Sequence, residues 1–166
     1  MIKADSYDPI ETKVDSAFAP YDLPAFHEQV IELLKMGVEM QGYKEKAKQA
    51  KSSMAIWSNP YNAFSRNEYQ ENKAEYEEYK EKQKAIEKRI KKSAEKIRET
   101  AQESPEFIGF KAFHRYRTNN NAGQTLLREV LYIFNKDFTQ ILAVYDTASE
   151  EYVVYQQLIK QMQEDN

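Results

Sequence analysis

The fold is decided by residues 22–57, which read DLPAFHEQVIELLKMGVEMQGYKEKAKQAKSSMAIW. Asp22 suits an N-cap, and Pro24 is tolerated in the first turn of a helix. Beyond them runs a seam with a spacing of three and four residues, in which nine of ten positions are apolar or aromatic: Phe26, Gln29, Leu33, Met36, Met40, Tyr43, Ala47, Ala50, Met54 and Trp57. Such a repeat is typical of a long helix that packs along one stripe. We predict this helix over about 23–57.

A second helix is expected after a break at residues 58–62, where Pro60 disfavours helical geometry in the residue before it. Ser65 and Glu68 have the spacing of a capping box. The seam that follows keeps the same period with more polar members: Tyr69, Asn72, Tyr76, Tyr79, Gln83, Ile86, Ile90, Ser93, Ile97 and Thr100. We predict the second helix over about 66–102.

The two seams come into register when the helices fold back on each other about Tyr61. Small Ala47 would then face bulky Tyr76, which is the volume pairing that a packed seam needs. The charges favour the same antiparallel arrangement, because the acidic first half of each helix would lie beside the basic second half of the other. Residues 22–103 are therefore predicted to form a long antiparallel helical hairpin.

The chain beyond Pro105 changes to a period of two, which is typical of strands. Strands are expected over about 108–117, 126–134 and 141–145, and the short turns between them imply an antiparallel meander. Thr147 and Glu150 form another capping box, which opens a final helix. This helix is expected to cover one sheet face, because three strands alone cannot protect a core.

The predicted fold class is therefore α+β. An extended leader occupies 1–21, the helical hairpin 22–103, and a βββα unit 104–166. In that unit a three-stranded antiparallel meander is followed by a C-terminal helix.

Composition excludes several classes of protein. The net charge of −3 gives no general attraction to nucleic acid or to an acidic membrane surface. The absence of cysteine excludes disulfides, thiolate metal sites and a cysteine nucleophile. No apolar run approaches the roughly 18 residues of a transmembrane helix, and residues 1–5 lack the apolar core of a signal peptide. The chain is expected to be cytoplasmic, or to be a mature form whose signal peptide has been removed.

The basic run from Lys82 to Arg98 raises the alternative of a nucleic-acid-binding hairpin. The aromatic residues of this helix lie in the seam instead, where they are not available as stacking platforms. We therefore read the run as a solvated helix face whose charge is balanced by the partner helix, and nucleic acid as an unfavoured partner.

The densest group of chemically capable side chains is His114, Arg115 and Arg117. Asp146 on the third strand or Glu129 on the second could join it to make a site with both cationic and acidic groups. A small hydrolase or nuclease would need these groups to converge. Alternation along the strand places His114 on the opposite face from the two arginines, so ordinary cross-strand pairing is the favoured interpretation. With His27 as the second histidine, no histidine metal site is apparent, and no cofactor is expected.

An aromatic group marks the predicted hairpin end: Trp57, Tyr61 and Phe64. Aromatic residues at such a place can anchor a partner. Two structural roles are the alternatives to partner binding: Phe64 could form a hydrophobic staple, and Trp57 could close the end of the seam. These three residues are our candidate partner-binding site.

A motif near the first strand carries a resemblance. Ser104-Pro105-Glu106-Phe107, Tyr116-Arg117-Thr118-Asn119-Asn120 and Gly123 resemble a pattern of uncharacterised small exported bacterial domains of the Bacteroides type. The start at Tyr7-Asp8-Pro9 resembles the mature start of secreted proteins from the same group. The resemblance implies a periplasmic or cell-surface location, which we favour slightly over the cytoplasm. It implies no catalytic residue.

The sequence thus favours a non-enzymatic protein-interaction or structural module. A protein partner or self-association, through exposed hairpin surface or a free sheet edge, would serve such a role.

Overall fold

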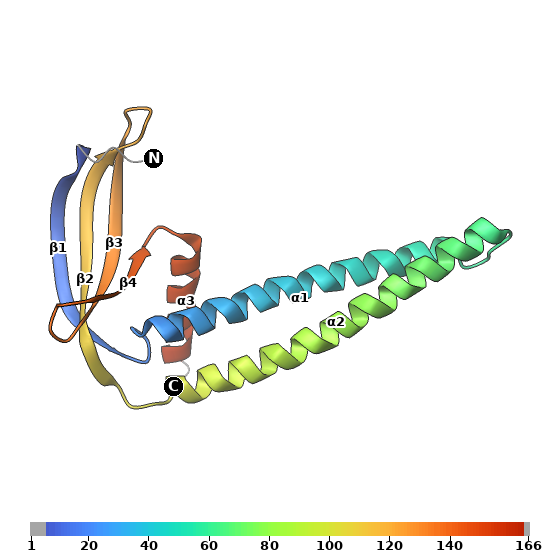
Figure 1. Ribbon diagram of the computed structural model, residues 1–166, viewed down its shortest axis with the longest axis horizontal. Coiled ribbons are helices and arrows are strands. Elements are labelled where there is room, and N and C mark those ends of the chain that lie inside the picture. Colours follow the sequence, from blue (N-terminus) through green and yellow to red (C-terminus); the bar gives the residue numbers. More distant parts are fainter. Residues whose placement is uncertain (1–5, 165–166) are drawn as a thin grey trace. The chain divides into compact units, whose positions relative to one another are not determined.

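The computed structural model describes residues 6–164 and has an α+β fold (Figure 1). Its three helices are α1 (Pro24–Ile56), α2 (Ala63–Ala101) and α3 (Glu150–Glu164). Its four strands are β1 (Asp8–Ala19), β2 (Glu106–Asn119), β3 (Thr125–Asn135) and β4 (Ile141–Asp146). The α+β class and the helical hairpin are thus confirmed.

The chain divides into two compact units. The sheet unit comprises Met1–Ile31 and Glu99–Asn166, and the hairpin unit comprises Glu32–Arg98. The first turns of α1 therefore belong to the sheet unit, and the rest of that helix belongs to the hairpin unit. This division differs from the predicted boundaries, which placed all of α1 in the hairpin.

The sheet has four antiparallel strands in the order β1-β2-β3-β4. The prediction of a three-stranded meander was wrong, because the expected extended leader contains β1. This strand pairs with β2 along most of its length, from Asp8 opposite Arg117 to Ala19 opposite Glu106. Residues 8–15 are exposed at the sheet edge. Backbone pairing therefore holds β1 in place, and its side chains do not show the apolar alternation of a half-buried strand.

An irregularity in the pairing of β1 with β2 lies between Ala17 and Phe18. Ala17 is opposite Gly109, which has a φ of +150°. A Cβ atom at Gly109 would lie 2.0 Å from the carbonyl oxygen of Phe134 on β3. The close approach of β2 to β3 therefore requires glycine at position 109.

One face of the sheet, the inner face, packs against α3. Leu131 and Ile133 of β3 lie on it and are buried together with Ala17 of β1 and Tyr152 of α3. Figure 1 shows α3 on one side of the sheet, as expected of the final helix. Its N-cap differs from the expected one: the amide of Tyr152 donates to Ser149 Oγ at 3.3 Å.

The hairpin unit packs along the two predicted seams. Every predicted seam position within it is buried or half-buried, and Ala47, Ala50 and Ile86 are among the most buried. Near the middle, the rings of Tyr43 and Tyr79 stack with their centroids 6.3 Å apart. The side chain of Gln83 donates to the Tyr43 carbonyl at 3.1 Å, so a polar seam member also joins the helices.

The charges of the hairpin unit pair both between helices and within α2. Arg89 lies 3.9 Å from Glu32 across the hairpin. Within α2, Lys82 pairs with Glu78, and further ion pairs join Lys73 to Glu77, Lys84 to Glu81 and Lys91 to Glu87. These pairs are exposed and contribute little stability. The acidic partners within α2 neutralise part of the positive charge of the run from Lys82 to Arg98. No helix in the described part of the chain has the length and hydropathy needed to cross a bilayer.

Candidate functional site

The hairpin tip, which we define as residues 52–65, is built around a tightly bonded turn. Asn62 caps α2, because its side-chain oxygen accepts from the Ser65 amide at 2.8 Å. Ser65 Oγ in return accepts from the amides of Asn62 at 3.1 Å and Tyr61 at 3.0 Å. This reciprocal cap starts α2 at Ala63, earlier than the capping box expected at Ser65. The turn is therefore held in a defined shape.

Large apolar side chains project from the hairpin tip into solvent. Ile56 is 75% exposed, Tyr61 80% and Phe64 61%. Trp57 is half-buried and meets the ring of Phe64 edge to face, with centroids 5.7 Å apart. The aromatic pair is thus ordered by its own contact, while one side of Phe64 stays open.

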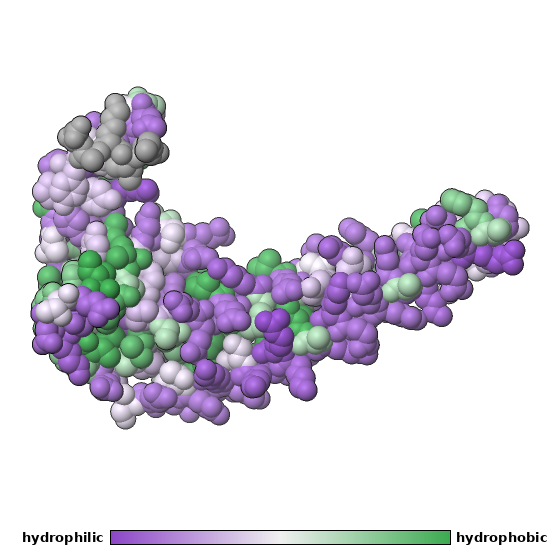
Figure 2. All heavy atoms as spheres, in the orientation of Figure 1, coloured by the Kyte–Doolittle hydropathy of each residue, from purple (hydrophilic) through white to green (hydrophobic). Residues whose placement is uncertain are grey.

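The tip also differs from the rest of the hairpin in charge. Residues 52–65 contain no charged residue, whereas 31% of the whole chain is charged. In Figure 2 the hydrophobic colour gathers at this end of the hairpin, beyond a largely hydrophilic shaft. An apolar and uncharged end on a charged shaft is the kind of exposed patch that commonly marks an interaction site.

The three aromatic candidates from the sequence do lie together at the tip. The aromatic pattern of the sequence does not identify Ile56, which is aliphatic and lies outside the predicted seam. The gap in charge over residues 52–65 is the signal that could have identified it.

The four catalytic candidates from the sequence have separate partners. His114 lies on the outer face of the sheet, opposite to the inner face, between Tyr7 and Thr12. Its Nε2 is 2.6 Å from the Tyr7 hydroxyl, and its Nδ1 is 2.8 Å from Thr12 Oγ1. Arg115 alternates to the inner face and pairs with Glu129 at 3.5 Å.

The remaining two candidates are also paired. Arg117 lies 3.3 Å from Asp8, and Asp146 lies 3.3 Å from Arg128. Asp146 shares the outer face with His114, but Val130 stands between them in the strand register. The structure does not bring the four side chains together. Among the described residues, no group of three or more histidine, aspartate or glutamate side chains could hold a metal ion.

The outer face of the sheet carries aromatic rings in contact with one another. Phe110 stacks on Phe138 with centroids 4.4 Å apart, and Phe134 lies 5.4 Å from Phe138. Val14 and Val144 on the same face are each more than half exposed. This face is therefore more apolar than a fully solvated sheet face, although its rings shield one another.

No family model, curated protein or solved structure matches the chain. The candidate site therefore rests on the geometry of the tip alone.

Proposed function

We propose that this chain is a non-catalytic interaction module that binds a protein partner through its hairpin tip. The observation that carries the proposal is the exposure of Ile56 at the end of α1 and of Tyr61 and Phe64 around the start of α2, where the bonds of Asn62 and Ser65 hold the turn. A preorganised surface loses little conformational entropy on binding, so more of its contact energy becomes affinity.

The expected strength of such a contact supports the proposal. Full burial of one large apolar side chain is worth about 1.5–3 kcal/mol. This is the scale of a hot-spot residue, and hot spots are enriched in aromatic side chains surrounded by neutral or polar neighbours. Asn59 and Ser58 lie beside the anchors and provide polar groups for the rim of an interface. This mixture favours a protein partner over the acyl region of a lipid bilayer.

The test compares the wild-type chain with a tip variant that carries Ile56→Ser, Tyr61→Ser and Phe64→Ser. The control is Val38→Ser, because Val38 is 76% exposed on α1 and lies outside the tip. Each chain is used to capture proteins from an extract of the native host, and its mass in solution is measured by light scattering. We expect the wild type and the control to recover the same partner, or to self-associate equally, and the tip variant to lose either property.

Three outcomes would overturn the proposal. The tip variant could retain the partner of the wild type. The wild type could be a strict monomer that recovers nothing. Thirdly, the wild type could sediment with vesicles of phosphatidylethanolamine and phosphatidylglycerol while the tip variant does not, which would assign the tip to lipid. The exported location implied by the sequence resemblance stays a prediction, and a signal peptide encoded upstream of residue 4 would support it.

A further inference from the structure

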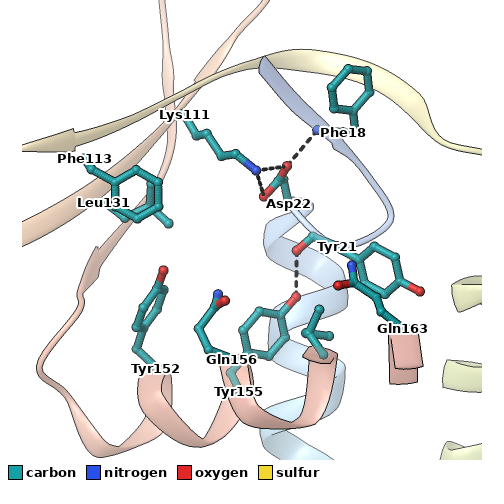
Figure 3. Close-up of a pocket in the computed structure, with 11 residues that line it drawn as sticks. Phe18, Tyr21, Asp22, Lys111, Phe113, Leu131, Tyr152, Tyr155, Gln156 and Gln163 are labelled. Atoms are coloured by element: carbon teal, nitrogen blue, oxygen red, sulfur yellow. Dashed lines mark hydrogen bonds and ion pairs between the residues drawn. The ribbon is translucent and has the colours of Figure 1, made fainter. Parts of the chain in front are cut away.

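A cavity of about 360 Å³ lies within the sheet unit, between α3 and the inner face of the sheet (Figure 3). Its size is that of a small-molecule site. Phe113 and Leu131 supply apolar wall from the sheet, and Ile159 supplies it from α3. The tip belongs to the other unit, so this cavity is a separate feature of the molecule.

Polar groups face one another across the cavity. On one side, the Asp22 carboxylate accepts from Lys111 Nζ at 3.0 and 3.2 Å. On the other, the hydroxyl of Tyr152 and the amide of Gln156 point from α3 toward that pair (Figure 3). Tyr155 does not take part, because its hydroxyl donates to the Tyr21 carbonyl at 2.6 Å. A molecule in the cavity would thus meet hydrogen-bonding groups at both ends and apolar side chains between them.

The charges of the lining cancel. Among the described residues that line the cavity, Asp22 and Lys111 are the charged pair, and each neutralises the other. Burial raises the pKa of Tyr152 to about 12, so its hydroxyl stays protonated and can donate or accept. A charged ligand would have to leave water without a free countercharge, whereas an uncharged ligand would meet no such cost.

The cavity adjoins a smaller space of about 20 Å³, which shares Tyr152, Tyr155 and Gln156 with it and is also lined by His27. Nε2 of His27 is buried without a hydrogen-bond partner from any described protein group. A buried polar atom without a partner is unusual and calls for a reason. A ligand that extends from the larger space toward this nitrogen would provide one.

We propose that this cavity is a binding site for an uncharged small molecule that combines a ring with a carboxamide or hydroxyl group. The ring packs between Phe113, Leu131 and Ile159. The polar group bonds to Tyr152 and Gln156, or to the Asp22–Lys111 pair opposite them. The residues that line the site all belong to the sheet unit, so this proposal does not rest on the proposed role of the hairpin tip.

The test uses three probes with the same ring and different charge: benzamide, benzoate and benzylammonium. Each is titrated into the isotope-labelled full chain, and the backbone amide resonances of residues around the cavity are followed by NMR. We expect saturable shifts with millimolar benzamide at Lys111, Phe113 and Tyr152. Benzoate and benzylammonium should bind at least about fivefold more weakly, because each brings an unpaired charge.

Two variants and one control assign the binding to the cavity. Gln156→Trp fills the space from an exposed position of α3, so the fold is retained while benzamide binding is lost. Tyr152→Phe removes one hydroxyl and should weaken binding about threefold to tenfold. Tyr132→Phe makes the same change on the outer face and should have no effect. The proposal is overturned if benzamide gives no saturable shift, if either charged probe binds as well, or if Gln156→Trp binds benzamide like the wild type.

Discussion

Asp22 and Lys111 join the entry of α1 to the middle of β2. The two side chains are 18% and 25% exposed, and Nζ of the lysine lies 3.0 Å from the nearer carboxylate oxygen. That oxygen also accepts from the Phe18 amide at 2.8 Å. The carboxylate therefore serves the sheet unit as a bridge between three segments.

Breaking this pair should destabilise the sheet unit. Lys111→Met leaves the half-buried Asp22 carboxylate without its counter-ion, and we expect a loss of about 1–3 kcal/mol in the free energy of unfolding. Urea unfolding measures the change. The double variant Asp22→Asn with Lys111→Met should lose less than the sum of the two single variants, because the charges act as a pair. Strict additivity would show that the pair contributes nothing.

His27 should make stability depend on pH. Its ring lies between those of Tyr145 and Tyr155, at centroid distances of 4.4 and 4.3 Å, and burial lowers its pKa below the ordinary 6.5. Glu151 and Glu28 oppose this shift by their negative charge. Below pH 6.5 the unfolded chain takes up a proton at this residue before the folded chain does. Stability should therefore be complete above pH 6.5 and fall as the pH decreases below it.

The measurement compares urea unfolding at pH 7.5 and pH 5.5 in the wild type and in His27→Phe. Carboxylates contribute to the pH dependence of both chains, so the difference between them isolates His27. We expect the wild type to lose more stability on acidification than the variant. An equal loss would mean that the ring is protonated as readily in the folded state as in the unfolded state.

Two glycines should respond in opposite directions to the same substitution. Gly109→Ala places a Cβ against the Phe134 carbonyl in a backbone conformation that disfavours side chains, and should cost about 2 kcal/mol or more. Gly37 lies in α1 with nothing within 4 Å of the added carbon. Gly37→Ala should therefore stabilise the chain by up to about 1 kcal/mol. Thermal unfolding of both variants checks the pair, and a neutral Gly109→Ala would refute the close approach of β2 and β3.

The hairpin could be predicted from sequence because its stabilising contacts repeat at a fixed local spacing. Met36, Ala47 and Ile86 are buried where the period of the seams places them. Strand β1 could not be predicted in this way. Its register is fixed by backbone pairing with residues about 100 positions away, and most of its side chains remain exposed. The local sequence likewise predicts Asp22 as the N-cap of α1, whereas its carboxylate accepts hydrogen bonds from Lys111 and from the Phe18 amide.

The candidate sites show the same division. Trp57, Tyr61 and Phe64 could be identified from sequence because a short turn brings them together. The cavity could not, because Asp22, Lys111 and Tyr152 come from three distant segments. Alternation along β2 would suggest that apolar Phe110 faces α3 and that charged Lys111 faces solvent. The structure has the reverse, with Lys111 on the inner face and Phe110 on the outer face. Tertiary contacts therefore decide which face of β2 is inner, and the alternating pattern alone cannot.

Ser65 provides a test of how the hairpin tip keeps its shape. Its side chain is fully buried, and its hydroxyl oxygen accepts from two backbone amides of the turn. Ser65→Ala leaves both amides without this partner and should cost about 1–3 kcal/mol. Ser52 is the matched control, because its exposed hydroxyl donates to the Lys48 carbonyl within α1. Ser52→Ala should be neutral or slightly stabilising, since alanine is the better helix former.

Hydrogen exchange distinguishes a local effect of Ser65→Ala from a general one. We expect the amides of Tyr61 and Asn62 to exchange faster in this variant, while amides of the sheet unit keep the protection of the wild type. If the tip binds its partner as a preformed surface, the same variant should also weaken partner capture, although every exposed anchor is still present. Unchanged exchange at Tyr61 and Asn62 would show that the turn is held by contacts other than the Ser65 hydroxyl. Preorganisation by the cap would then no longer explain affinity at the tip.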